Sequence, residues 1–128
     1  MAVTHPTTFR DAVADLVDST LGTTAKLVFR LSGTAGSPGT AVTTLAFGNP
    51  AFGASSSGVI TANAITSDTN ATGNASPVAN ATLETGGGTV VVHCAVAASA
   101  SDINMTGGLT IGAGDTVACS SLTYTAMP

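Results

Sequence analysis

The sequence predicts a mainly β domain, an antiparallel sandwich or jelly-roll-like fold with one short amino-terminal helix. The chain of 128 residues holds several short runs of β-branched and aromatic residues, separated by turns rich in Gly, Ser, Pro and Asn. Its composition favours strands as well, because 22 Thr and 12 Ser, together 34 of 128 residues, stand beside few charged residues. The length fits one domain over residues 1–128, with no internal repeat and no linker.

A single helix is expected, over residues 8–21. Thr8 is its expected amino-terminal cap, and Gly22 supplies the stop. Apolar side chains recur at helical spacing and predict one stripe that covers a sheet: Phe9, Val13, Leu16, Val17 and Leu21. The acidic side chains are expected largely on the solvent side: Asp11, Asp15 and Asp18. The alternative is a helix that docks onto another subunit.

Six or seven strands are expected after the helix. The runs that predict them are residues 25–31, 42–48, 59–66, 78–85, 89–97, 109–111 and 116–125. Three glycines, 86–88, predict a reversal before residues 89–97, and the Gly112 to Asp115 turn predicts a hairpin between the last two runs. In the run 89–97, one all-apolar set is expected to face the core: Val90, Val92, Cys94 and Val96.

Charge and hydropathy argue against nucleic-acid and membrane partners. Only 8% of the residues are charged, the formal net charge is −4, and three side chains are basic: Arg10, Lys26 and Arg30. A nucleic-acid-binding protein neutralises several phosphates with such side chains. No apolar run approaches the roughly 18 residues that cross a bilayer, and residues 1–10 lack the pattern of a secretory signal. We therefore expect a protein that is made in the cytoplasm. Its mean hydropathy is +0.43.

No catalytic, cofactor or metal site is expected from the motifs. His93 and Cys94 are neighbours in a predicted strand, so their side chains point to opposite faces and form neither a catalytic dyad nor, with Cys119, a zinc site. Residues 68–73 imitate the first half of a calcium loop, but Ala79 stands where the loop needs a bidentate Glu. The sequence thus predicts a protein that is not an enzyme and has no cofactor. The two cysteines are expected to be buried thiols, with a disulfide as the alternative.

Five residues are candidates for contacts between subunits. The amino-terminal arm, residues 1–7, contributes Val3, His5 and Pro6, because the proline favours an extended approach to a neighbour. Phe47 and Phe52 bracket a turn that can carry one of them to an exposed contact, and core packing is the alternative for both.

Three segments resemble a family of small virion proteins from tailed bacteriophages. The first is LAFGNPAFGASSSGVITANAITSDTN, residues 45–70. The second is D-I-N-M-T, residues 102–106, followed by the Gly-Ala-Gly-Asp turn and the run 117–124, which is similar to the closing hairpin of that family. The R-D-A-V-A-D-L pattern of the predicted helix is similar in kind.

The resemblance implies a structural protein of the virion. Some relatives are head decoration, or cement, proteins with jelly-roll-like folds that bridge capsid subunits, which implies the major capsid protein and further copies of this chain as partners. A low-charge surface suits permanent contacts, because few charges lose their hydration. The alternatives are a tail or neck component and a carbohydrate-binding adhesion module on the virion. The lack of Trp and the single Tyr count against the adhesion module.

Overall fold

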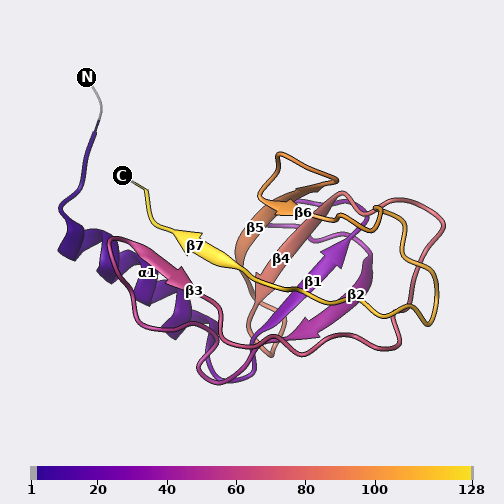
Figure 1. Cartoon of the computed structure of the whole chain (residues 1–128), viewed down its shortest axis with the longest axis horizontal. Helices are drawn as coiled ribbons and strands as arrows, with labels where there is room; N and C mark the ends of the chain where they lie inside the picture. Colours follow the sequence, from indigo (N-terminus) through magenta and orange to yellow (C-terminus); the bar gives the residue numbers. More distant parts are fainter. Residues whose placement is uncertain (1–2, 128) are drawn as a thin grey trace.

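The computed structural model describes residues 3–127 and contains one helix and seven strands within them (Figure 1). The elements are α1 (Thr7–Leu21), β1 (Lys26–Arg30), β2 (Ala41–Ala46), β3 (Val59–Thr61), β4 (Asn80–Glu84), β5 (Val90–Ala97), β6 (Ile103–Asn104) and β7 (Thr123–Thr125). The mainly β fold with one amino-terminal helix is therefore as the sequence predicts.

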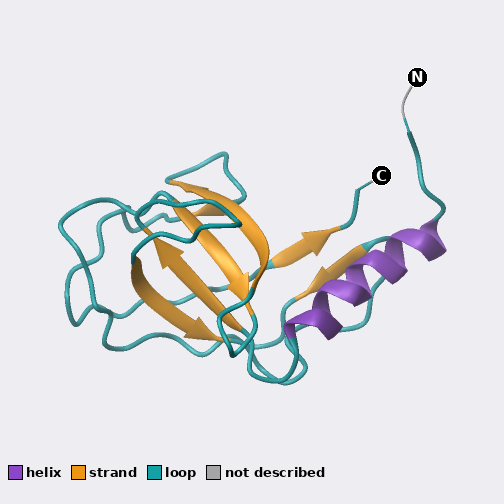
Figure 2. Cartoon of the chain, turned by 180° about the vertical axis from the view of Figure 1, so that it is seen from behind, coloured by secondary structure: helices purple, strands orange, loops and turns teal. Residues whose placement is uncertain are grey.

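The strands form two sheets. The larger has the order β2-β1-β4-β5-β6, and the smaller pairs β3 with β7. All pairs are antiparallel except β5 with β6, which is parallel, so the larger sheet is mixed and not purely antiparallel as predicted. Figure 2 shows the larger sheet curled, with α1 and the small sheet together at one end of the molecule.

The predicted closing hairpin is wrong. Residues 109–111 form no strand, and their carbonyl groups instead accept hydrogen bonds from the Val78 and Asn74 amides, both 2.8 Å long. Only residues 123–125 of the run 116–125 are a strand, which pairs with β3, so the turn at 112–115 connects no hairpin. β6 was not predicted, because two residues carry no periodic pattern.

Helix α1 begins one residue before the predicted start and ends where predicted. Gly22 has φ 78°, a left-handed conformation that glycine adopts without strain, and its N–H donates to the Asp18 carbonyl at 3.3 Å. Thr8 does not cap the helix: Pro6 holds the capping position, and no side chain bonds there. Proline suits the entry to a helix because its φ is already fixed near the helical value.

The predicted apolar stripe of α1 is divided between two sides. Leu21 is buried together with Ala14, which was not in the predicted stripe, and Val13 and Val17 pack partly against the core. Phe9 and Leu16 instead remain 49% and 62% exposed. The helix is thus apolar on its outer side as well as on the side that covers the small sheet.

Two carboxylates of α1 accept hydrogen bonds from a neighbouring loop. The prediction that the acidic side chains of the helix simply face solvent is therefore wrong for these two. Asp11 accepts a hydrogen bond from the Gly58 amide at 2.7 Å, and Asp18 accepts one from the Phe52 amide at 2.9 Å. Gly58 has φ 77°, and a Cβ there would meet the Arg10 side chain at 2.9 Å. The helix therefore fixes the segment that leads into β3 through backbone contacts that a larger residue at 58 would disturb.

The hydrophobic core contains side chains from α1, from both sheets and from the loops. Its largest fully buried side chains are Phe52, Leu21, Leu27, Leu45, Ile60 and Val42. On β5, Val96 is buried and Val92 and Cys94 pack partly against the core, as predicted, whereas the predicted core residue Val90 does not belong to it. The opposite side of β5 is not purely solvent-facing, because Val91 also packs against the core.

An ion pair crosses the centre of the larger sheet. Arg30 on β1 donates to the Glu84 carboxylate on β4 at 2.5 Å, and the two side chains are 13% and 3% exposed. Arg30 also donates to the Thr82 hydroxyl at 3.2 Å and to the Gly39 carbonyl in the β1–β2 loop at 2.6 Å. The Thr82 hydroxyl donates to the same Glu84 oxygen. One arginine therefore neutralises a buried carboxylate and ties the loop to the sheet.

Replacing Arg30 by methionine is expected to destabilise the fold by about 3–5 kcal/mol, because Glu84 is then a buried charge without its partner. Urea unfolding at pH 7 measures the change. The double variant Arg30→Met/Glu84→Leu should recover most of the lost stability, since no unpaired charge remains. Lys26→Met removes a cation opposite Glu84 that forms no ion pair with it, and should cost less stability than Arg30→Met. Equal losses in the single and double variants would contradict the assignment.

Candidate functional site

The structure separates the residues that sequence inspection had weighed for catalysis. His93 is exposed and Cys94 packs against the core, so they lie on opposite faces of β5, as the strand geometry predicts. Within residues 3–127, no group of three His, Cys, Asp or Glu side chains is placed to hold a metal ion.

Both cysteines are free thiols and half-buried. Burial and, to a smaller extent, the nearby Asp102 carboxylate raise the pKa of Cys94 to about 11. Burial also raises the pKa of Cys119, against a weaker, lowering effect of a backbone hydrogen bond from Ser121. The Cys119 thiol itself donates to the Ser121 carbonyl at 3.4 Å. Since the thiolate is the reactive form, both groups are poor nucleophiles near neutral pH.

Alkylation of Cys94 should therefore be slow and strongly pH-dependent. At pH 8 a thiol with a pKa of about 11 is only about 0.1% thiolate, against roughly a quarter for an ordinary cysteine, so we expect at least about a hundredfold slower labelling. The rate should rise about tenfold per pH unit up to pH 10. Iodoacetamide labelling followed by peptide mass spectrometry measures it, with the urea-unfolded chain as control. Equal rates in the folded and unfolded chains would contradict the burial of this thiol.

Residues 68–73, the imitation of a calcium loop, serve a structural purpose. The Asp68 carboxylate accepts the Thr43 hydroxyl at 2.6 Å and the backbone amides of Thr44 and Asn70 at 3.1 and 3.0 Å. The hydrogen bond from Thr43 is the main reason why the pKa of Asp68 lies below its ordinary value, and the bond from Asn70 comes next. This carboxylate therefore ties the loop to β2.

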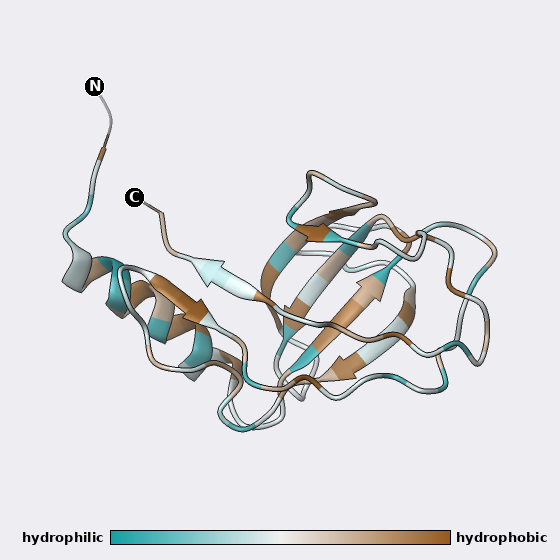
Figure 3. Cartoon of the chain, in the orientation of Figure 1, coloured by the Kyte–Doolittle hydropathy of each residue, from teal (hydrophilic) through white to brown (hydrophobic). Residues whose placement is uncertain are grey.

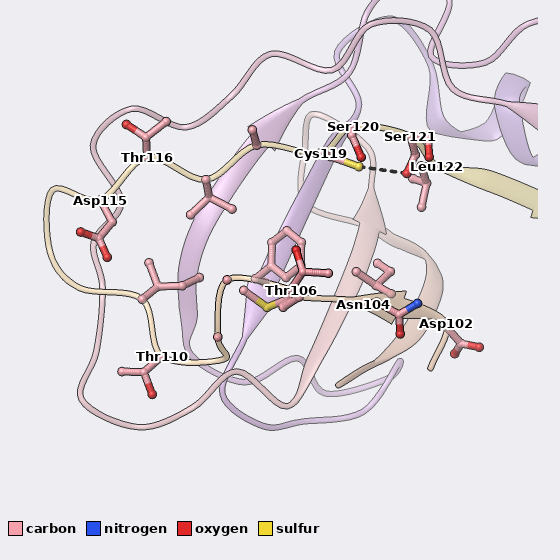
Figure 4. A pocket seen from close by; sticks show the side chains of 18 residues that line it. Asp102, Asn104, Thr106, Thr110, Asp115, Thr116, Cys119, Ser120, Ser121 and Leu122 are labelled. Atoms are coloured by element: carbon pink, nitrogen blue, oxygen red, sulfur yellow. Dashed lines mark hydrogen bonds between the residues drawn. The ribbon is translucent and has the colours of Figure 1, made fainter. Parts of the chain in front are cut away.

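A hollow of about 640 Å³, which we call the groove, lies between two stretches of the chain. Its walls are residues 102–108, which contain β6, and residues 115–122, which precede β7. Figure 4 shows side chains from both walls turned toward the space between them. The rim is polar and carries Asp102, Asn104, Thr106, Thr110, Asp115, Thr116, Ser120 and Ser121.

The floor of the groove is apolar. Phe29 from β1, Ile103 from β6 and Ile111 line it, and Leu122 closes the end next to β7. Phe29 and Ile111 belong to the hydrophobic core, so the groove opens onto the core and is not a superficial depression. An apolar floor inside a polar rim suits an extended peptide, whose side chains alternate between two faces while its backbone needs hydrogen-bond partners.

A second candidate surface is apolar and lies at the other end of the molecule. The exposed large hydrophobic side chains of residues 3–127 are Val3, Phe9, Leu16 and Met127, which we call the apolar end. They come from the arm before α1, from α1 itself and from the residues after β7. Figure 3 shows these segments together at one end, with N and C marking the two termini. Such a concentration is typical of an interaction surface.

The structure divides the five predicted contact residues. Val3 is 78% exposed, Pro6 is exposed, and the half-buried His5 ring stacks on Phe9 with the ring centroids 5.0 Å apart. Phe47 and Phe52 are 7% and 1% exposed and pack against each other in the core, 5.6 Å apart. The prediction of an intersubunit contact is therefore wrong for these two phenylalanines, and their alternative, core packing, is confirmed.

Sequence reasoning misses three residues of the apolar end. Phe9 and Leu16 belong to the stripe predicted to cover a sheet, and Met127 lies in no predicted element. Helical spacing reveals an apolar stripe but not which part of it a narrow two-stranded sheet can cover. The groove gave no local signal either, because its two walls come from separate stretches of the chain.

No family model, no curated protein and no solved structure matches the chain. No helix within residues 3–127 is both long and apolar enough to span a membrane.

Proposed function

We propose that this protein is a structural component of a tailed-bacteriophage virion, a decoration or cement protein that binds the head and stabilises contacts between capsomers. The observation that carries the proposal is the apolar end, where the exposed large hydrophobic side chains of the described chain gather. The resemblance of residues 45–70 and 102–124 to small virion proteins supports the same role.

The chemistry of the surface supports binding and not turnover. Phe9 and Leu16 sit on the outer side of α1, and Asp15 is the one exposed acidic side chain of that helix. An apolar, weakly charged face buries area at roughly 25 cal/mol per Å² with little charge desolvation. A protein present in many copies on a shell gains from such a permanent contact, and the major capsid protein is the partner that we propose for this face.

Quantitative mass spectrometry of purified particles tests the proposal at the level of the virion. We expect the ratio of this protein to the major capsid protein to be near one or a simple fraction of it, because a cement protein covers the whole shell. A few copies per particle would instead support the alternative, a component of the neck or tail. Absence from purified particles would overturn the virion assignment.

A substitution in α1 tests the docking face. Leu16→Asp should weaken binding to heads at least about tenfold, since it places a charge in an apolar contact. It should leave the unfolding midpoint nearly unchanged, because Leu16 is 62% exposed. Cosedimentation of the purified protein with heads that lack it gives the affinity. Ser99→Asp, exposed in the loop that follows β5, adds the same charge outside α1 and is the control. Unaltered binding by Leu16→Asp would exclude this face.

A further inference from the structure

The groove lies between the edge of the larger sheet and a stretch without regular secondary structure. The edge strand is β6, the last strand of that sheet, and its Ile103 and Asn104 line the groove. The stretch is residues 118–121, whose Ala118, Cys119 and Ser120 backbone N–H groups donate to no backbone carbonyl within residues 3–127. Exposed edges of this kind are templates for pairing with another extended segment.

The stretch 118–121 belongs to an interrupted ladder. Residues 59–68 and 117–125 run antiparallel: β3 pairs with β7, the Ala62 amide donates to the Leu122 carbonyl at 2.8 Å, and Asp68 and Val117 exchange two hydrogen bonds of 3.0 and 2.8 Å. Between these points the two segments separate, and residues 118–121 lose their partner on this side.

The segment 59–68 of this ladder also pairs with the larger sheet, at the end of β2. Ala46 at the end of β2 and Thr66 exchange hydrogen bonds of 3.3 and 2.8 Å. Neighbouring segments can therefore be followed in one continuous order around the core: β6, β5, β4, β1, β2, residues 59–68 and residues 117–125. The groove is the gap between the first and the last of these.

The structure is thus an open barrel from which one strand is missing. Figure 1 shows residues 117–125 crossing over the larger sheet on the way to β7, so the curled sheet and this segment enclose the core between them. A closed barrel has no free edges. One extended segment in the groove would lie beside β6 on one side and residues 118–121 on the other, and would cover the apolar floor.

We propose that this missing strand is supplied by the amino-terminal arm, residues 1–6, of a second copy of the chain. Pro6 has the extended backbone angles φ −62° and ψ 153°, and the Val3 side chain is 78% exposed. Figure 1 shows the arm leaving the α1 end, away from β6. The recipient is therefore another molecule.

The chemistry of the arm matches that of the groove. The groove carries two carboxylates, Asp102 and Asp115, and no basic side chain, whereas residues 1–6 contain no acidic residue and include His5. Val3 and Thr4 are β-branched and suit a strand, and the apolar floor at Phe29 and Ile103 can receive one face of it. Asp102 already accepts the Ala95 amide at 2.9 Å, which holds this wall in place.

Such an exchange is a head-to-tail contact. Each copy gives its arm to one neighbour and receives an arm from another, which builds a ring if the rotation closes and a chain if it does not. The proposal rests on the assembly of many copies in the proposed function and specifies which two surfaces of the chain meet. It leaves Phe9 and Leu16 of the apolar end for the capsid.

A disulfide crosslink tests the contact directly, because Cys119 lines the groove. The variant Val3→Cys/Cys94→Ala, oxidised with copper phenanthroline, should give a ladder of multimers on a non-reducing gel, with residue 3 of one copy linked to Cys119 of the next. The matched control Leu16→Cys/Cys94→Ala carries an exposed cysteine outside the arm and should give no link to Cys119. Absence of the 3–119 link at concentrations where the protein is oligomeric would overturn the proposal.

Hydrogen exchange provides a second readout that needs no new cysteine. The amides of residues 118–121 should exchange at least about tenfold more slowly in the assembled full chain than in the variant lacking residues 1–6. A synthetic peptide of residues 1–8 should restore the protection, while circular dichroism confirms that the shortened chain is folded. Equal exchange in the two proteins would contradict the proposal.

The outcomes separate this proposal from the proposed function. Protection of residues 118–121 only on capsids, and not in the assembled free protein, would make a capsid-protein segment the occupant and overturn the exchange between copies. Absence of the protein from purified particles would overturn the virion role. It would not affect the 3–119 crosslink, which tests only the contact between copies of the chain.

Discussion

Burial of the whole of β4 constrains the rest of the fold. Its five residues are all buried, so both faces of this central strand need a covering layer. On one face Ala81 and Leu83 join the hydrophobic core. On the other, Thr82 and Glu84 are polar and buried, and the Arg30 side chain satisfies both of them while it holds the β1–β2 loop. A hydrophobic core alone would leave that second face with an uncompensated charge.

The layer that covers the first face leaves two hollows. Long stretches without regular secondary structure, not a second complete sheet, lie over the larger sheet, and their attachment depends on single contacts such as Asp68 with Thr43 and Asp68 with Val117. At residues 119–122 the layer separates from residues 62–65, and a second, smaller hollow lies between these two segments. The groove is a separate hollow, between residues 102–108 and residues 115–122.

The two surfaces of the proposals differ in the interaction they can provide. The outer side of α1 presents Phe9 and Leu16, so the contact proposed for it is burial of apolar area. The groove borders β6 and residues 118–121, so the contact proposed for it is pairing of backbone groups with an extended segment. A cement protein uses both kinds of contact if it must join a shell and its own neighbours at once.

Local pattern in the sequence determined the elements that depend on local forces. The helix ends at Gly22 because that residue takes a left-handed conformation without strain. β1, β2, β4 and β5 fall within about two residues of the predicted runs because strand-forming residues between turn residues mark them. Only the tertiary structure decided which edges pair: β7 with β3 instead of residues 109–111, and β6 parallel to β5. It also decided that Leu16 stays exposed and Phe47 and Phe52 do not. Strand partners and burial of this kind depend on segments that are far apart in the sequence. The spacing of residues within one segment does not determine which distant segment packs against it.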